Sequence, residues 1–317
     1  MATIVTITFN PAIDKSTTVP LLIPEKKLNC SAPTYEPGGG GINVARAIKR
    51  LGGNATAIYL SGGYTGRTFT ELLLKEEIDI ISIKTEGLTR ENLVVKEIAS
   101  NQQFRFGMPG DPVAEKEWKN CIKALSKIPD VKYIVVSGSL PIGIPLDVFD
   151  SLSKIAQFKK ARLIVDTSGA ALKYAVTNGT FLIKPNLKEL AMLVGATQLS
   201  IDQVEQASKE IISQYQCEAV VTSLGSEGAI LTTVDGAYRI TAPKVAVQST
   251  VGAGDSMLAG ITLSLSNNNS LIESAKYGVA CGTAATMNQG TELCHINDVR
   301  NLYDQIVKNS QLKSIIK

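Results

Sequence analysis

Residues 250–256, Thr-Val-Gly-Ala-Gly-Asp-Ser, place small residues and one carboxylate directly before an apolar segment with helical spacing. The first N–H groups of a helix have no partners within the helix, and with the helix dipole they attract a phosphate or a developing oxyanion. Gly252, Ala253 and Gly254 would let such a ligand approach the backbone. Asp255 beside it is suited to act as a general base, although aspartate is also a preferred helix cap. The pattern alone leaves both roles open.

A second glycine-rich loop opens the helix predicted over residues 42–51. It reads Glu-Pro-Gly-Gly-Gly-Gly-Ile-Asn over residues 36–43. No Gly-Lys-Ser/Thr follows, so it is not a Walker phosphate loop, and no acidic residue ends a strand about 20 residues later, as a dinucleotide site requires. Asn43 on the first helical turn is suited to binding hydroxyl groups, and a flexible turn is the alternative interpretation.

Further polar residues follow predicted strands, where an open α/β sheet binds its ligands. Asp14 could accept two sugar hydroxyls or serve as an ordinary turn residue. Asn186 and Glu189 share a helix face and suit a hydrated magnesium ion, although a capping arrangement explains the same spacing. The glycine-containing loop of residues 223–228 suits nucleotide phosphates.

Short Val- and Ile-rich runs alternate with helical patterns along most of the chain. Buried parallel strands are expected at residues 3–8, 56–60, 133–137, 162–166, 181–184 and 219–223, and helices at 42–51, 65–74, 115–125, 146–155, 201–215 and 271–288. The alternation predicts one α/β domain over residues 1–317, with a doubly wound, mostly parallel sheet flanked by helices.

Two segments interrupt this alternation. Residues 15–37 have no helical pattern, and residues 92–106 read as two strands around a polar turn. Over about 15–37 and 90–108 they are expected to form a small β-sheet that covers the site as a lid. Lys27, Arg90 and Arg105 lie in or beside this lid, where cations could meet a sugar phosphate.

Composition restricts the class of protein. Hydrophobic residues make up 44% of the 317 residues. The formal net charge is +3 and the sequence contains no block of like charges, which excludes an extended surface for nucleic acid or an anionic membrane. We expect no signal peptide and no membrane span, because no basic leader and no apolar run of roughly 20 residues is found. Five scattered cysteines without a CxxC spacing favour a reducing cytoplasm, and the single histidine, His295, excludes multi-histidine metal sites.

Three motifs occur in a diagnostic order and spacing: the glycine loop at 38–43, Asn-x-x-Glu at 186–189 and Gly-Ala-Gly-Asp at 252–255. With them the chain resembles the ribokinase-type carbohydrate kinases over nearly its whole length. The stretches most similar to the bacterial 6-phosphofructokinases of that family are residues 35–48, 137–141, 248–257 and 288–291. The resemblance implies a ribokinase-like α/β core with a β-lid, lids paired in a homodimer, and transfer of the γ-phosphoryl group of ATP to the 1-hydroxyl of fructose 6-phosphate.

The resemblance also implies a role for each motif residue. Asp255 would be the base, and Gly252, Ala253 and Gly254 the anion site. Sugar-phosphate contacts would come from Asp14, Lys27, Gly39, Gly40, Asn43, Arg90, Arg105 and Ser139. ATP contacts would come from Lys184, Asn186, Ser223, Gly225, Ser226, Gly228, Val279 and Thr283. Glu189 would belong to the Mg²⁺ network, and a K⁺ site would be built from Ser249, Val251, Ala285, Asn288 and Gly290.

Two alternative functions are consistent with the same motifs. A 1-phosphofructokinase or tagatose 6-phosphate kinase usually carries Lys where this chain has Gly40, which favours the 6-phosphofructokinase. A catalytically silent sugar-phosphate-binding regulator would not need Asp255 and the complete anion loop. Glu292 stands where the related sequence carries Arg, which puts the ion affinity of the cation site in question but not the chemistry.

Overall fold

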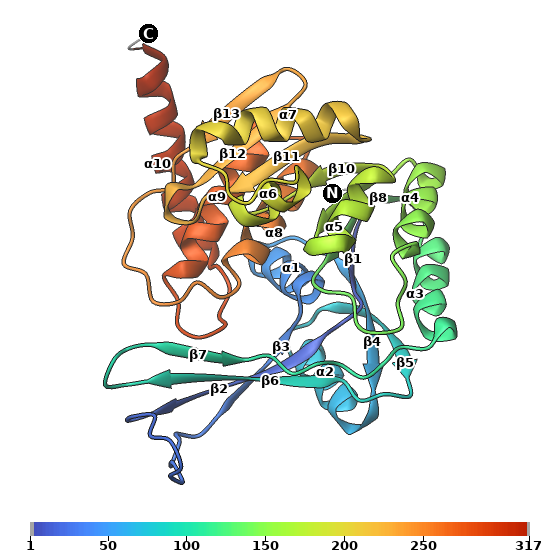
Figure 1. Cartoon of the computed structure of the whole chain (residues 1–317), viewed down its shortest axis with the longest axis vertical. Coiled ribbons are helices and arrows are strands. Elements are labelled where there is room, and N and C mark those ends of the chain that lie inside the picture. The colour runs from blue at the N-terminus through green and yellow to red at the C-terminus, as the bar shows by residue number, and fades with distance from the viewer. Residues whose placement is uncertain (1–2, 316–317) are drawn as a thin grey trace.

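The computed structural model describes residues 3–315, with side chains described for residues 3–309. A large body of helices around one sheet lies above a smaller sheet in Figure 1. Within residues 3–315 the larger sheet has nine strands in the order β13 (Gly236–Ile240), β12 (Ala229–Thr233), β11 (Cys217–Ser223), β10 (Thr180–Ile183), β9 (Arg162–Asp166), β8 (Val131–Ser137), β1 (Thr3–Thr8), β4 (Thr56–Gly62) and β5 (Asp79–Thr85).

All neighbouring strands from β11 to β5 pair in parallel, whereas β12 and β13 are antiparallel additions. Parallel strands are buried on both faces, which explains why β1 and β8 are rich in Val and Ile. β1 lies between β4 and β8, so the direction of strand addition reverses beside it. Such a switch point leaves a crevice outside the carboxyl ends of the strands, where open α/β sheets bind ligands.

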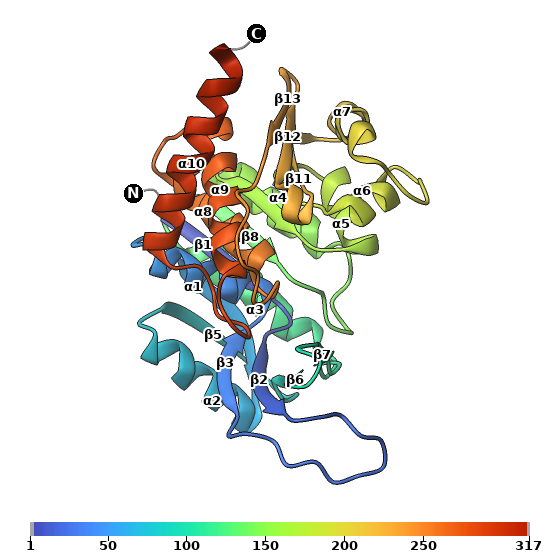
Figure 2. The same cartoon turned by 90° about the vertical axis from the view of Figure 1, so that its left-hand side faces the viewer.

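Helices cover both faces of the large sheet, as Figure 2 shows from the side. One face packs against α1 (Gly40–Arg50), α2 (Gly63–Lys75), α8 (Ala253–Ser266), α9 (Leu271–Thr286) and α10 (Ile296–Ile315). The other face packs against α3 (Glu115–Lys127), α4 (Val148–Lys159), α5 (Gly169–Thr177), α6 (Leu187–Leu193) and α7 (Val204–Gln214). α8 is buried from Ser256 to Ser266, so the N-terminus of a core helix is fixed at the crevice.

The smaller sheet has four strands within the described residues, in the order β3 (Thr34–Gly38), β2 (Ala12–Val19), β6 (Arg90–Glu97) and β7 (Gln103–Phe106). β2 pairs in parallel with β6, and the outer strands pair antiparallel. The hairpin predicted over residues 92–106, with its turn at 100–102, is therefore confirmed, as is the joining of the two interrupting segments in one sheet. The sheet is mixed because β2 and β6 both leave the large sheet in the same direction.

The predicted α/β class, the six strands and the six helices are confirmed, with small differences at their ends. Three strands of the large sheet were not predicted: β5, β12 and β13. β5 is an edge strand whose burial alternates, and β12 and β13 form a hairpin at the other edge. Within residues 3–315 no helix is long and apolar enough to cross a membrane. All five cysteines are free thiols.

Candidate active site

The loop of residues 250–254 leads into α8, whose N-terminus lies at the centre of the site. Gly252 precedes the helix with φ 73°, a left-handed conformation that glycine adopts without strain. Asp255 is the third helical residue, and its Oδ2 accepts a hydrogen bond of 2.9 Å from Asn43 Nδ2 at the start of α1. No side chain caps α8, so the interpretation of Asp255 as a helix cap is wrong.

The surroundings of Asp255 favour a proton acceptor. Burial raises the pKa of Asp255 from 3.8 to about 6, and the carboxylates of Asp166 and Asp14 also raise it. The Asn43 hydrogen bond and the Lys184 ammonium lower it. A carboxyl group with a pKa near 6 is mostly ionised at neutral pH and is a stronger base than an exposed aspartate. Asp255 therefore has the protonation behaviour that a general base needs.

Lys184 lies against the loop that precedes α8. Its Nζ is 3.2 Å from Asp166 Oδ2 at the end of β9, and a Cβ on Gly254 would lie 3.3 Å from the same nitrogen. Burial by itself lowers the pKa of Lys184, but the carboxylates of Asp166, Asp255 and Glu189 together raise it above its ordinary value. The ammonium group thus stays charged beside the anion loop, where it can attract a phosphate.

Close packing fixes the glycine loop of residues 38–41. A Cβ at Gly40 would overlap Ser137 Oγ, and one at Gly41 would lie 2.6 Å from Ile7 O. α1 therefore begins directly against the carboxyl ends of β1 and β8. The loop is a fixed helix start rather than a flexible turn. The absence of side chains at Gly40 and Gly41 lets β1 and β8 pack closely against the backbone of this loop.

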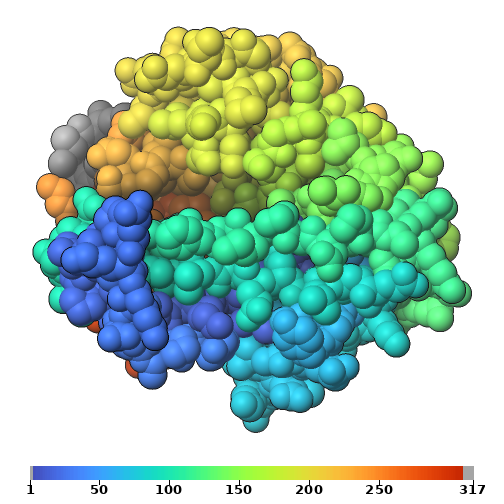
Figure 3. All heavy atoms as spheres, turned by 60° about the horizontal axis from the view of Figure 1, so that its bottom comes forward, coloured from blue at the N-terminus to red at the C-terminus, as the bar shows by residue number. Residues whose placement is uncertain are grey.

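A cleft of about 300 Å³ opens between these elements. Figure 3 shows the molecule hollowed between the teal atoms near residue 100 and the yellow and orange atoms of its C-terminal half. Six of the residues expected from the sequence border the cleft: Gly39, Gly40, Asn43, Ser139, Glu189 and Asp255. Its remaining lining comes from the ends of β8 and β9 and the residues after them. The volume is in the range of small-molecule sites.

Arg90, at the start of β6, lies next to the loop that follows β1. Its Nη2 donates to Asn10 O at 3.2 Å, and Asn10 Nδ2 donates to Ser139 Oγ at 3.0 Å. Arg90 Nε is buried without a hydrogen-bond partner. Because a buried guanidinium nitrogen needs an acceptor, this group is suited to an anionic ligand.

Asp14 belongs to β2, so the interpretation as a turn residue is wrong. Its Oδ1 accepts a hydrogen bond of 2.8 Å from Asn92 Nδ2, and a Cβ at Gly38 would overlap the carboxylate. Burial raises the pKa of Asp14, which the Asn92 hydrogen bond and the charge of Arg90 partly offset. The carboxylate is thereby held in one position by the small sheet.

The other two cations expected to contact the sugar phosphate, Arg105 and Lys27, are exposed. Arg105 on β7 donates from Nη2 to Thr250 Oγ1 at 3.4 Å and to Gln103 Oε1 at 3.2 Å. It thus links the small sheet to Thr250, which lies just before the expected anion site of residues 252–254. Lys27 lies in the long loop between β2 and β3 and makes no hydrogen bond or ion pair with another described residue. Within one chain, Lys27 is not brought to the cleft.

The segments expected to bind ATP meet at the ends of β10 and β11. Asn186 Oδ1 accepts from Glu189 N at 2.9 Å, and Glu189 Oε2 accepts from Asn186 N at 2.9 Å. The pair forms a capping box on α6, as the alternative interpretation expected. Asn186 also pairs with Ser223 in an isolated parallel bridge, which joins this segment to the loop of residues 223–228.

Gly225 and Gly228 have positive φ angles of 60° and 95°, with Ser226 between them in a short 3₁₀ turn. Val279 and Thr283 lie one turn apart on α9, and Thr283 Oγ1 donates to Val279 O at 2.8 Å. Both are buried, and Val279 belongs to the core that packs against the large sheet.

The segments expected to hold K⁺ are joined by hydrogen bonds. Ser249 Oγ donates to Gly290 O at 2.6 Å, Val251 N donates to Ser249 Oγ at 3.2 Å, and Asn288 N donates to Ala285 O at 3.2 Å. A set of backbone and hydroxyl oxygens fits the ligand preference of K⁺.

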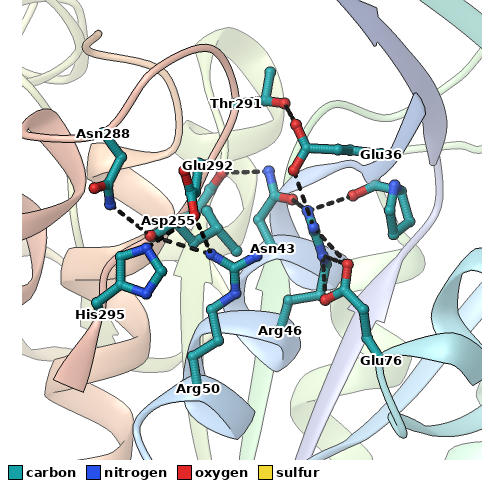
Figure 4. Close-up of polar contacts among 12 residues, drawn as sticks. Glu36, Asn43, Arg46, Arg50, Glu76, Asp255, Asn288, Thr291, Glu292 and His295 are labelled. Atoms are coloured by element: carbon teal, nitrogen blue, oxygen red, sulfur yellow. Dashed lines mark hydrogen bonds and ion pairs between the residues drawn. The ribbon is translucent and has the colours of Figure 1, made fainter. Parts of the chain in front are cut away.

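Glu292 follows this loop and is paired. Its Oε1 is 3.9 Å from Arg50 Nη1 and 2.8 Å from His295 Nε2. Arg50 Nη1 also donates to Leu293 O at 3.2 Å, and Figure 4 shows these side chains together. The negative charge at position 292 is therefore balanced by a neighbouring arginine.

Comparisons with known proteins agree with this geometry. The model of the pfkB family of carbohydrate kinases matches residues 4–298. The chain belongs to this family. It is 44% identical to the ATP-dependent 6-phosphofructokinase isozyme 2 of Escherichia coli over 304 residues, which cover 96% of this chain and 98% of the relative.

The fold of this family member is shared with a solved relative. The crystal structure of Escherichia coli phosphofructokinase-2 in complex with potassium superposes with a TM-score of 0.93 and 44% identity, covering 97% of this chain and all of that one. The expected ribokinase-like fold is thereby confirmed. The same relative has also been solved in a tetrameric inhibited form. The 1-phosphofructokinase of Bacillus subtilis is 30% identical over 91% of this chain and 95% of its own.

Several residues at the site of this pfkB-family kinase were not predicted from the sequence. Asp166 lines the cleft and pairs with Lys184, and its position as the last residue of a buried strand was an available signal. Asn10 and Asn92 hold Ser139 and Asp14, and no motif distinguishes them from loop asparagines. Arg46 contacts Asn43. In the sequence it is only one residue of the predicted helix of residues 42–51, and nothing there indicates a role at the site.

Proposed function

We propose that this protein transfers the γ-phosphoryl group of ATP to the 1-hydroxyl of D-fructose 6-phosphate, giving fructose 1,6-bisphosphate and ADP. One observation carries the proposal: the Asp255 carboxylate, with a pKa of about 6, lies on the first turn of buried helix α8 and borders a cleft. The 44% identity to an enzyme named for this reaction supports the choice of substrate.

The reaction requires a proton acceptor and stabilisation of the transferred charge. Asp255 would accept the proton of the sugar 1-hydroxyl as the hydroxyl oxygen bonds to the γ-phosphorus. The bond from that phosphorus to the β–γ bridging oxygen breaks at the same time, and ADP leaves with the bridging oxygen. The free N–H groups of residues 252–254, at the positive end of α8, would bind the oxygens of the transferred group. Lys184 would add a fixed positive charge beside them. Positioning and charge neutralisation are the main tasks of a phosphoryl-transfer site.

Binding of the sugar phosphate would use both sheets. We assign the sugar hydroxyls to Asp14, Gly39, Gly40 and Asn43, and the 6-phosphate to Ser139, Arg90, Arg105 and Lys27. The unpaired Arg90 Nε supports the assignment of Arg90. Segments 15–37 and 90–108 would act as a lid on one kinase domain, and the contact from Arg105 to Thr250 supports such a closure.

We assign the nucleotide to Lys184, Asn186, Ser223, Gly225, Ser226, Gly228, Val279 and Thr283. The position of Glu189 in the cleft supports a role in holding the hydrated magnesium of ATP. Bound magnesium neutralises phosphate charge during the reaction. K⁺ would be bound by the oxygens of Ser249, Val251, Ala285, Asn288 and Gly290, and a solved relative with potassium supports this.

Two other functions can be separated from this one by the same residues. A 1-phosphofructokinase or tagatose 6-phosphate kinase usually carries Lys at position 40, where a Cβ would overlap Ser137 Oγ in this chain. A silent sugar-phosphate-binding regulator would not need the raised pKa of Asp255. Both observations favour the 6-phosphofructokinase.

The deciding experiment is a coupled ADP-release assay with Mg²⁺ and K⁺ present. Fructose 6-phosphate, fructose 1-phosphate and tagatose 6-phosphate are compared, each with the wild type and with Asp255→Asn. We expect the highest kcat/KM with fructose 6-phosphate. A higher value with another sugar would assign the enzyme to that sugar, and no release above the Asp255→Asn background would favour the regulator.

We also propose that the small sheets of two chains pair in a homodimer. Leu21, Tyr35, Ile98, Phe106 and Met108 on or beside this sheet are exposed large hydrophobic residues. The tetrameric form of the relative supports self-association. Light scattering after size exclusion would measure the mass, and a monomer at micromolar concentration would contradict the proposal.

A further inference from the structure

Arg46 on α1 is almost fully buried, with 1% of its surface exposed. A buried guanidinium needs several partners, and Arg46 makes six hydrogen bonds to four residues around the base, which are Glu76, Pro37, Asn43 and Glu36. On the basis of the proposed kinase function, we propose that Arg46 is a positioning residue for the catalytic Asp255, acts through the Asn43 amide, and is itself held by Glu76.

Asn43 stands between Arg46 and Asp255, as Figure 4 shows. Arg46 Nη1 donates to Asn43 Oδ1 at 3.4 Å and to Pro37 O at 2.8 Å. Asn43 Nδ2 donates to Asp255 Oδ2 at 2.9 Å. An arginine can only donate hydrogen bonds and a carboxylate can only accept them, so these two neighbours impose a single orientation on the amide. The Asp255 carboxylate is thereby fixed from the side of α1.

Carboxylates hold the guanidinium in its place. Glu76, which follows α2, accepts from Arg46 Nε at 2.9 Å and also contacts Nη2 at 2.6 Å. Glu36 on β3 is 3.3 Å from Nη2, and its second oxygen accepts a hydrogen bond from Thr291. Thr291 follows Gly290 of the expected K⁺ segment. Arg46 therefore connects α2, the small sheet and the cation segment to the base.

Loss of this support has a defined electrostatic consequence. The charged groups that face Asp255 are Asp166 from β9, Lys184 after β10 and Asp14 from β2. A substitution at position 76 replaces none of them and keeps the charge of Arg46, which lowers the pKa of Asp14. The Asn43 hydrogen bond lowers the pKa of Asp255, so disturbing it raises that pKa. The acidic limb of the kcat/KM profile would then move to higher pH, and kcat would fall because the base is misplaced.

The first test compares neighbouring glutamates. Glu76→Gln weakens the support of Arg46, whereas Glu77→Gln removes only an exposed pair in which Lys49 Nζ is 3.8 Å from Glu77. We expect Glu76→Gln to lower kcat about three- to tenfold and to raise the acidic limb measurably, with KM for fructose 6-phosphate changed less. Glu77→Gln should match the wild type. Equal kcat and equal pH profiles for the two variants would overturn the proposal.

A double-mutant cycle tests the route through Asn43. Arg46→Met is expected to lower kcat about 10- to 100-fold in the wild type, and much less when Asn43→Ala is already present. Additive losses would overturn the route through Asn43. Thermal unfolding of each variant reports folding, and if Arg46→Met does not fold, the comparison of Glu76→Gln with Glu77→Gln decides.

Failure of the proposed function would be visible separately. The wild-type rate is measured first with all three sugar phosphates, and the variants are then studied with the sugar that gives the highest rate. A wild type that prefers another sugar changes the proposed substrate but not the test of Arg46. A wild type that phosphorylates none of them overturns both, because no base then needs positioning.

Discussion

The surroundings of Asp255 and the region of the small sheet differ in how their charged groups are held. Around Asp255, the side chains of Asn43, Lys184 and Asp166 are buried or partly buried and are connected by hydrogen bonds and an ion pair. On the small sheet and in its β2–β3 loop, Arg105 and Lys27 are exposed, and Arg105 makes contacts of 3.2 to 3.4 Å. The groups proposed for catalysis are thus held by neighbouring side chains, whereas the two exposed cations proposed to bind the phosphate are held less firmly.

The difference between the two regions follows from their proposed tasks, which are catalysis around Asp255 and phosphate binding beside the small sheet. A base and an oxyanion site act efficiently when they need no rearrangement in the transition state, so burial in a fixed environment is an advantage. A phosphate on the substrate can attract exposed cationic side chains and bind them as a lid closes. Arg90 is intermediate, because it is half-buried but keeps one unpaired nitrogen.

The largest effect is expected from a substitution of Asp255, the buried carboxylate proposed as the base. Asp255→Asn should lower kcat by about 10²- to 10⁴-fold with a small change in KM, because only the proton acceptor is lost. Steady-state kinetics measures both constants. The melting temperature at pH 7 should equal or exceed that of the wild type, since the raised pKa of Asp255 means that its charge opposes folding above about pH 6. A large loss of melting temperature would instead indicate a structural role.

A smaller effect is expected from a substitution of Arg90, which is half-buried. Arg90→Gln should raise KM for fructose 6-phosphate by about 10- to 100-fold, the value of one or two charge-assisted hydrogen bonds, with kcat affected less. Arg105→Gln is the matched control on the same sheet and should have a weaker effect, because its side chain is exposed. Equal effects of the two substitutions would contradict the proposed difference between them.

The pH dependence sharpens the comparison without a substitution. Because Asp255 must be ionised to accept a proton, kcat/KM should fall about tenfold per pH unit below the pKa of about 6. Folding stability should change in the opposite direction. The folded state binds the proton of Asp255 more tightly than the unfolded state does, so this group adds stability as pH falls from 6 towards 4. An acidic limb near pH 4 would show that the carboxyl is not buried in solution.

The smallest effect is expected in the exposed loop between β2 and β3. Lys27→Ala should raise KM for the sugar phosphate up to about fivefold, and Lys26→Ala, one residue away and also exposed, should not. Because Lys27 does not reach the cleft within one chain, its effect should depend on lid closure or on a second chain. A dilution series of the wild type and Lys27→Ala would reveal the second case as a concentration-dependent KM.

Local sequence determined the parts of the site that depend on neighbouring residues. The Gly252 to Asp255 motif specified a helix start with an acidic residue on its first turn, and the glycines of residues 38–41 specified a second one. Short runs rich in Val and Ile specified the buried parallel strands. These predictions succeeded because backbone conformation and periodic burial are set by residues a few positions apart.

Tertiary structure decided which residues meet. Asp255 and Asn43 are 212 positions apart, and nothing in either motif states that the two helix starts face each other. The roles of Asp166 and Arg46 also came from contacts between distant elements. A carboxylate on a helix start can cap that helix or act as a base. The structure excludes the cap because Gly252 occupies that position. The packing around Asp255 favours the base, because desolvation and neighbouring charges set its pKa, and these depend on the folded surroundings rather than on the adjacent sequence.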